Sequence, residues 1–277
     1  MICFPNAKIN LGLNILSKRQ DGFHKLESVF LPVGWSDILE VIPVSDSAEN
    51  KLSMEQTGLP LGIAAGENLA FQACKNLRKD FDLPNLKIAL HKQIPFGAGL
   101  GGGSSDAASM ILLLDRLFGL SLSKEKTLSY LEKLGSDCPF FYANQPAFVR
   151  GRGDIIEPFQ VNLNGYYLMI IVPEVRISTA EAFKFISPGK PDIPLKKALE
   201  FPVEDWKYLV KNDFEDALFL KYPEFSYIKN KMYSSGAVYS SLSGSGSAIY
   251  GIFRNKIKPV DVFPGQVCWF EKINNPN

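Results

Sequence analysis

A run of glycines constrains this chain more than any other feature. Residues 95–108 read P-F-G-A-G-L-G-G-G-S-S-D-A-A, and five of the seven residues from 97 to 103 are glycine. Glycine adopts positive φ and lets a ligand approach the backbone closely. The next stretch, residues 104–118, is almost wholly apolar and predicts a buried helix that ends near Gly119. Because unpaired N–H groups at a helix start attract anions, the sequence predicts a site for a di- or triphosphate.

Three other interpretations of this loop fit less well. G-x-G-x-x-G at residues 97–102 matches the dinucleotide fingerprint, but an acidic residue about 20 positions on should end a second strand. Here Asp115 lies inside the predicted helix instead. A Walker A loop carries lysine after its final glycines, and Gly103 occupies that position. A flexible connector rarely leads directly into so apolar a helix, so phosphate binding is favoured.

Composition excludes several classes of protein. The net charge of +1 gives no general attraction to nucleic acid or to anionic membranes. Two histidines, and four cysteines without a C-x-x-C pair, make a zinc cage or a disulfide framework improbable. No apolar run approaches the ~20 residues of a membrane helix, and the first residues do not resemble a signal peptide. We therefore expect a cytoplasmic protein with no nucleic-acid or membrane partner and no metal-ligand cluster.

Strand and helix patterns alternate irregularly along the chain. The first half predicts strands at residues 9–15, 26–33, 38–44 and 86–92, with a turn at 34–37 and helices at 69–81 and 128–134. The second half predicts strands at 166–172, 237–242, 247–253 and 267–272, and helices at 179–186, 203–210 and 223–234. This order indicates an α+β fold rather than a doubly wound parallel sheet. We place two domains at residues 1–158 and 159–277.

Four further segments carry polar residues in distinctive patterns. They read P-N-A-K-I-N-L at residues 5–11, D-G-F-H at 21–24, L-G-S-D-C-P-F-F at 134–141 and L-S-G-S-G-S at 242–247. Each has a plain structural interpretation. Lys8 and Asn10 fit the polar face of an edge strand, and D-G fits a hairpin turn followed by an ordinary histidine. Asp137 fits a helix N-cap. S-G-S-G-S fits a hairpin turn.

Taken together, the glycine-rich loop and these segments resemble the GHMP kinases, the superfamily of galactokinase, homoserine kinase and mevalonate kinase. The motifs occur in the family's order over nearly the whole chain. The resemblance implies an α+β GHMP kinase fold of two domains with a cleft between them. The N-terminal domain would be ribosomal-protein-S5-like, with a left-handed βαβ crossover, and the C-terminal domain would be α+β.

The triple glycine and D-G-F-H resemble one branch of that family in particular. The implied reaction transfers the γ-phosphoryl group of ATP, with Mg²⁺, to the 2-hydroxyl of 4-diphosphocytidyl-2-C-methyl-D-erythritol, in the non-mevalonate route to isoprenoid precursors. The enzyme would be a monomer or weak homodimer. Lys8 and Asp137 would be the catalytic pair, with Asp137 orienting or accepting the hydroxyl proton. Sequence cannot show that these two residues meet.

The resemblance also implies the binding residues. Phe23 stands where the family usually has tyrosine, which keeps stacking on cytosine but removes a hydroxyl. Phe183 would cover the second face of the base, or else pack in the core. The implied substrate contacts are Asn10, Phe23, His24, Asp137, Thr179 and Phe183. The implied ATP contacts are Pro95, Phe96, Gly97, Ala98, Gly99, Leu100, Gly101, Gly102, Gly103, Ser104 and Ser105, with Asn68 and Lys92 on the adenine side.

Two alternatives stay open at this point. One is a GHMP kinase acting on a smaller alcohol such as homoserine or mevalonate, against which D-G-F-H and the triple glycine argue. The other is a catalytically silent relative that only binds nucleotide. The presence of both Lys8 and Asp137 argues against it.

Overall fold

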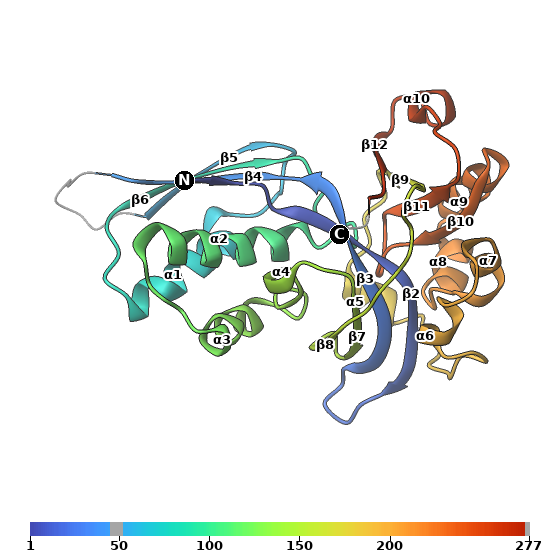
Figure 1. The fold of residues 1–277 in the computed structure, drawn as a ribbon, viewed down its shortest axis with the longest axis horizontal. Coiled ribbons are helices and arrows are strands. Elements are labelled where there is room, and N and C mark those ends of the chain that lie inside the picture. The colour runs from blue at the N-terminus through green and yellow to red at the C-terminus, as the bar shows by residue number, and fades with distance from the viewer. Residues whose placement is uncertain (45–51, 275–277) are drawn as a thin grey trace. The chain divides into compact units, whose positions relative to one another are not determined.

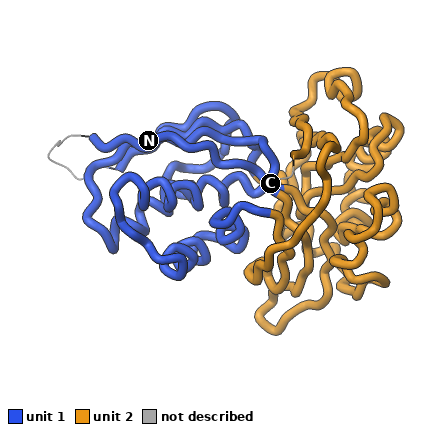
Figure 2. The backbone as a smooth tube through the Cα atoms, viewed as in Figure 1, with its two compact units in different colours: residues 1–8, 32–96, 101–145 blue, residues 9–31, 97–100, 146–277 orange. Residues whose placement is uncertain are grey.

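The structure is a computed structural model that describes residues 1–44 and 52–274 (Figure 1). The chain forms two compact units whose segments alternate along the sequence (Figure 2). The domain boundary expected after residue 158 falls within unit 2 and stays a prediction for the two family domains. Unit 1 contains residues 1–8, 32–96 and 101–145, and unit 2 contains residues 9–31, 97–100 and 146–277.

The sheet of unit 1 has four strands in the order β1-β4-β6-β5. β4 (Ile38–Pro43) runs antiparallel to β6 (Leu86–Lys92), and β5 (Leu52–Gly58) runs parallel to β6. The short β1 (Ile2–Cys3) pairs with β4 at the edge. Since β5 and β6 are parallel neighbours, the chain between them crosses over through a helix, as parallel pairing requires.

That crossover helix is α1 (Leu69–Asp80), which follows the short η1 (Ala65–Glu67). The predicted apolar helix is α2 (Gly102–Phe118), and it ends at Gly119 as expected, with φ of +60°. α1 and α2 lie on one face of the sheet (Figure 1). α3 (Lys124–Leu134) and α4 (Phe140–Ala143) complete the unit.

A second sheet has the order β2-β3-β7-β8. Its strands are β2 (Asn6–Lys18), β3 (His24–Ser36), β7 (Ala147–Gly151) and β8 (Ile155–Pro158). The turn predicted at residues 34–37 is wrong, because β3 continues through Ser36. Val33 and Trp35 are buried on alternate positions, and that packing keeps the backbone extended despite the intervening glycine.

The third sheet lies in unit 2 and is antiparallel, in the order β10-β11-β9-β12. Its strands confirm the four predicted in the second half within one or two residues at each end. They are β9 (Tyr167–Val172), β10 (Ala237–Leu242), β11 (Ile249–Phe253) and β12 (Val267–Lys272).

The helices of unit 2 are mostly short. Phe214, Phe225 and Met232 pack with Ile249 and Phe253 in one buried core. The helix predicted at residues 179–186 is shorter than expected and ends at 183. The stretch 203–210 divides into a 3-10 turn and one α-turn. The elements are α5 (Thr179–Phe183), α6 (Leu195–Ala198), η2 (Val203–Asp205), α7 (Trp206–Leu209), α8 (Glu215–Lys221), α9 (Pro223–Ser234) and α10 (Pro259–Val262).

Within residues 1–44 and 52–274, no helix combines the length and apolar character needed to cross a membrane.

Candidate active site

The glycine-rich loop has the backbone that its composition predicts. Gly97, Gly99 and Gly101 have φ of +71°, +75° and +70°, a region that side chains with a Cβ rarely adopt. Gly101 is the N-cap residue of α2, which begins at Gly102. The helix therefore starts with backbone N–H groups and carries no acidic residue in its first turn. This arrangement favours an anion at the helix N-terminus.

Residues 97–100 pack against a second loop of unit 2, which follows β10. The Ser243 hydroxyl donates to the Gly99 carbonyl at 2.9 Å, and the Ala248 amide donates to the Ala98 carbonyl at 3.1 Å. A Cβ on Gly99 would lie 2.0 Å from the Ser243 carbonyl oxygen. Only glycine therefore permits this approach, and the two motifs are in direct contact.

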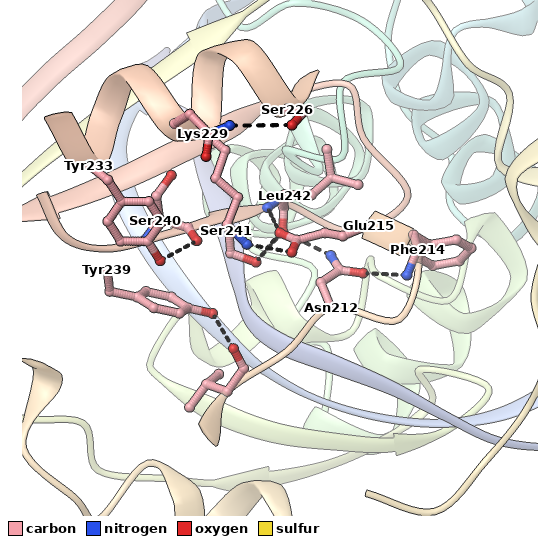
Figure 3. Close-up of polar contacts among 12 residues, drawn as sticks. Asn212, Phe214, Glu215, Ser226, Lys229, Tyr233, Tyr239, Ser240, Ser241 and Leu242 are labelled. Carbon is pink, nitrogen blue, oxygen red and sulfur yellow. Dashed lines mark hydrogen bonds and ion pairs between the residues drawn. The ribbon is translucent and has the colours of Figure 1, made fainter. Parts of the chain in front are cut away.

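A partly buried carboxylate fixes the strand that leads into the second loop (Figure 3). One oxygen of Glu215 accepts hydrogen bonds from the Ser241 hydroxyl at 2.9 Å and from the Leu242 amide at 2.8 Å. Its other oxygen pairs with Lys229 at 2.5 Å. Because Lys229 lies on α9 and Glu215 on α8, these helices hold the end of β10 in place.

Asn212 holds the same loop from its carbonyl side (Figure 3). Its amide nitrogen donates to the carbonyls of Leu242 and Gly244, each at 2.8 Å. Its amide oxygen accepts from the Phe214 amide at 3.0 Å. The buried Asn212 side chain therefore bridges the start of α8 and the loop after β10.

Lys8 and Asp137, which are far apart in sequence, meet in unit 1. The nitrogen of Lys8 lies 3.4 Å from an oxygen of Asp137, and their side chains are 4% and 31% exposed. Burial lowers the pKa of Lys8, while Asp137 opposes that shift. A Cβ on Gly101 would lie 3.1 Å from the Cγ of Lys8, so the pair stands beside the N-cap residue of α2.

The helix-cap interpretation of Asp137 is wrong. The helix that follows begins at Phe140, the residue at its N-cap position is Pro139, and no side chain caps it. The Asp137 carboxylate is therefore not used by a helix start. It remains available to a ligand on its exposed side.

The two serines after the glycines lie in the first turn of α2. Ser105 is buried, whereas Ser104 is partly exposed and is hydrogen-bonded to the Cys138 thiol. Burial raises the pKa of Cys138 to about 11, so this thiol stays protonated at neutral pH and is no nucleophile. Ser104 can offer a hydroxyl to a bound phosphate.

The two residues expected on the adenine side are both buried in unit 1. The Asn68 side chain accepts from the Ala70 amide at 2.9 Å and thereby caps α1. The Lys92 ammonium lies between the carboxylates of Asp37 and Asp106. Their contact with adenine stays a prediction.

The residues expected around the cytosine lie in unit 2. His24 stacks on Phe183 with ring centres 4.7 Å apart and planes 14° apart. Phe183 also meets Phe214 edge-on at 5.0 Å, so its partly buried ring packs against the core as well as against His24. Phe23 is exposed, and Arg152 lies over its ring at 5.1 Å. These rings offer apolar faces of the kind a nucleobase can stack on.

Asn10 and Thr179 make hydrogen bonds inside unit 2. The Asn10 amide nitrogen donates to the Ser28 hydroxyl at 2.8 Å, and Ser28 donates to the Gly12 carbonyl at 2.7 Å. The Thr179 hydroxyl lies 3.2 Å from the Ser245 hydroxyl of the second loop. Their role toward a substrate stays a prediction.

The sequence prediction misses four charged or amide residues around the loops. Asp106 offers a signal, as an acidic residue in a largely apolar helix. Asp37 is hidden because the residues around it suggest an ordinary turn. Asn212 and Glu215 lie in a stretch without a recognisable motif, and only the structure brings them to the loop.

Two family models match the chain. Residues 68–152 match the GHMP kinases N terminal domain, and residues 197–263 match the GHMP kinases C terminal domain. The chain belongs to the GHMP kinases and is an ATP-dependent small-molecule kinase with their two-domain α+β fold.

Its relatives define the branch. A "4-diphosphocytidyl-2-C-methyl-D-erythritol kinase" of Bacteroides thetaiotaomicron is 49% identical over 254 residues, covering 92% of each chain. A crystal structure of 4-(cytidine 5'-diphospho)-2C-methyl-D-erythritol kinase is 32% identical, with a TM-score of 0.78 over 91% of this chain and 90% of that one. Within its family, the chain therefore belongs with the 4-diphosphocytidyl-2-C-methyl-D-erythritol kinases. A mevalonate kinase, at 13% identity and a TM-score of 0.73, shares the fold alone.

Proposed function

We propose that the protein transfers the γ-phosphoryl group of ATP to the tertiary 2-hydroxyl of 4-diphosphocytidyl-2-C-methyl-D-erythritol. One observation carries the proposal beyond the family resemblance. The Lys8–Asp137 pair stands against Gly101, the N-cap residue of α2. A carboxylate and an ammonium are thus held at a helix N-terminus that attracts phosphate.

The glycine-rich loop and the start of α2 hold the triphosphate. The N-terminus of a helix carries about half a positive charge from its aligned peptide dipoles. The glycines at 97, 99 and 101 expose backbone N–H groups, because no Cβ covers them. The Ser104 hydroxyl adds a donor in the first turn.

Asp137 receives or orients the proton of the substrate hydroxyl. The neighbouring Lys8 ammonium favours the ionised carboxylate and offsets charge on the transferred group. Phosphoryl transfer passes through a loose transition state and needs mainly positioning and charge stabilisation. A partly exposed carboxylate beside a buried cation fits that requirement.

Mg²⁺ fits this site as an ion carried mainly by ATP. In residues 1–44 and 52–274 no three histidine, cysteine or acidic side chains gather to hold a metal. Mg²⁺ in kinases is commonly bound by substrate phosphates, waters and one or two protein oxygens. The Asp137 carboxylate and the Ser104 hydroxyl are the oxygens that would hold it. When bound, the ion neutralises phosphate charge.

The cytidine base stacks against the aromatic residues of unit 2. Phe23 presents an exposed ring, while His24 and Phe183 form a stacked pair. Burial and Lys18 lower the pKa of His24, so its ring is neutral at physiological pH and can both donate and accept. Asn10 and Thr179 are proposed as further substrate contacts and Asn68 as an adenine contact.

The proposal is tested by ADP release from Mg-ATP with purified protein. The acceptors are 4-diphosphocytidyl-2-C-methyl-D-erythritol, homoserine and mevalonate, each at the same concentration. We expect turnover with the cytidine compound alone. Turnover with another alcohol would overturn the assigned acceptor. ATP binding without turnover on any acceptor would overturn the assignment of a kinase reaction to this chain.

A further inference from the structure

Three buried charges form a cluster in unit 1 that the proposed reaction does not use. Lys92 lies at the end of β6, Asp37 between β3 and β4, and Asp106 in α2. Their exposed fractions are 3%, 0% and 1%. The Lys92 ammonium donates to Asp37 and, at 2.8 Å, to Asp106. One cation therefore serves two carboxylates in a region from which water is excluded.

The cluster joins the beginning and the end of the glycine-rich loop. The second oxygen of Asp37 accepts from the amides of Gln93 at 2.6 Å and Ile94 at 2.9 Å, directly before the loop. Asp106 follows the last loop glycine by three residues. A Cβ on Gly102 would lie 3.3 Å from the Lys92 nitrogen. Both ends of the loop therefore converge on one ammonium group.

We propose that Lys92, together with Asp37 and Asp106, is a positioning group that fixes the two ends of the phosphate loop and thereby sets the affinity for the ATP phosphates. The inference rests on the proposed function, because it takes the loop to be the ATP site. It gives Lys92 a role through the loop backbone. The nucleotide itself is held by the loop.

Asp106 is the member of the cluster whose charge can be removed with the least change in shape. One of its oxygens accepts from Lys92, and its second oxygen is buried and has no hydrogen-bond partner. Asparagine keeps an acceptor oxygen but carries no charge, and a hydrogen bond to a carboxylate is about twice as strong as one to a neutral group.

The test compares wild type with Asp106→Asn, which keeps the shape and removes the charge at every pH. The matched control is Asp115→Asn, the same change in the same helix, where the carboxylate accepts from the Leu122 amide. The dissociation constant of Mg-ATP, and the KM and kcat for turnover, are measured for all three proteins at pH 8.

We expect the Mg-ATP dissociation constant of Asp106→Asn to exceed that of wild type about tenfold at pH 8, as loss of one charge-assisted hydrogen bond implies. The KM for ATP should rise by a similar factor, with kcat little changed. Asp115→Asn should give a ratio near one. A ratio near one for Asp106→Asn, or an effect on kcat alone, would overturn the proposal. Because binding is measured without acceptor, this result is independent of whether the cytidine compound is the substrate.

Lys92→Met is a second variant that removes the cation. It should weaken Mg-ATP binding more than Asp106→Asn does, because it removes the cation that serves both carboxylates. If it does not fold, the Asp106→Asn comparison still decides the proposal. Folded Lys92→Met with wild-type affinity for Mg-ATP would overturn it.

Discussion

Replacing Gly99 with alanine tests the contact between the two loops of unit 2. The alanine methyl would lie 2.0 Å from the Ser243 carbonyl oxygen, whereas ordinary contact begins at 3.4 Å. The overlap is therefore 3.4 − 2.0 = 1.4 Å. Both atoms are fixed to the backbone, so no side-chain rotation can relieve it. One of the two loops must move.

Two costs add for this variant. The positive φ costs an alanine about 1–2 kcal/mol, and overpacking costs about 1–3 kcal/mol more, so the free energy of unfolding should fall by about 2–5 kcal/mol. Gly97→Ala is the matched control. Gly97 has φ of +71°, close to the +75° of Gly99, but no atom lies within 4 Å of its Cβ position. Gly97→Ala should therefore lose only the about 1–2 kcal/mol that the positive φ costs.

The assay is equilibrium unfolding in urea without nucleotide, followed by the KM for ATP. Gly99→Ala should lose more stability than Gly97→Ala, with the excess reporting the overlap with Ser243. Equal losses in the two variants would refute the argument that the Ser243 carbonyl excludes a side chain from position 99. An unchanged KM for ATP in Gly99→Ala would refute the claim that this contact shapes the phosphate site.

Three further predictions concern other parts of the site. Phe183→Leu removes the ring that stacks on His24 at 4.7 Å. Since an aromatic pair contributes about 0.5–1.5 kcal/mol, the KM for the cytidine substrate should rise about two- to tenfold. An equal rise in the KM for ATP would show that the ring does not act specifically at the cytidine site. Burial lowers the pKa of Lys8 in the folded protein below its usual value of 10.5. Between the folded and the unfolded pKa the unfolded chain therefore binds more protons, so the free energy of unfolding should rise with pH across that range. In urea unfolding at alkaline pH, Lys8→Met should lack this rise, and an identical pH profile in both proteins would count against the buried cation. Asn212→Asp replaces a donor to two carbonyls with a buried carboxylate. The free energy of unfolding should fall by about 3 kcal/mol. A loss below about 1 kcal/mol would show that Asn212 does not hold the loop.

The sequence predicts much of this fold because local patterns agree with the packing. The run 104–118 is apolar on nearly every face and is a helix, and the alternating strands of the third sheet form as expected. The turn at residues 34–37 is the exception. Its glycine and aspartate are typical turn residues, yet burial of Trp35 keeps the strand extended. Such burial depends on what packs across the strand, which local sequence does not record.

The site was predictable to the extent that its chemistry lies in motifs. The glycine backbone follows from composition, whereas the pairing of Lys8 with Asp137 follows only from the family resemblance, since nothing local links the two positions. The Asp37–Lys92 contact joins residues 55 positions apart. In the sequence, Asp37 and Lys92 each look like an ordinary surface charge. Only tertiary packing buries them together.

The catalytic pair is tested most directly by Asp137→Asn. The amide keeps the shape of the side chain but cannot take the hydroxyl proton, and general-base groups typically contribute about 10²–10⁴-fold in rate. We predict that kcat with the cytidine substrate falls within that range, while the dissociation constant of Mg-ATP, measured by calorimetry, changes less than threefold. If the variant keeps most of its kcat, Asp137 is not part of the mechanism, and the assignment of the Lys8–Asp137 pair fails.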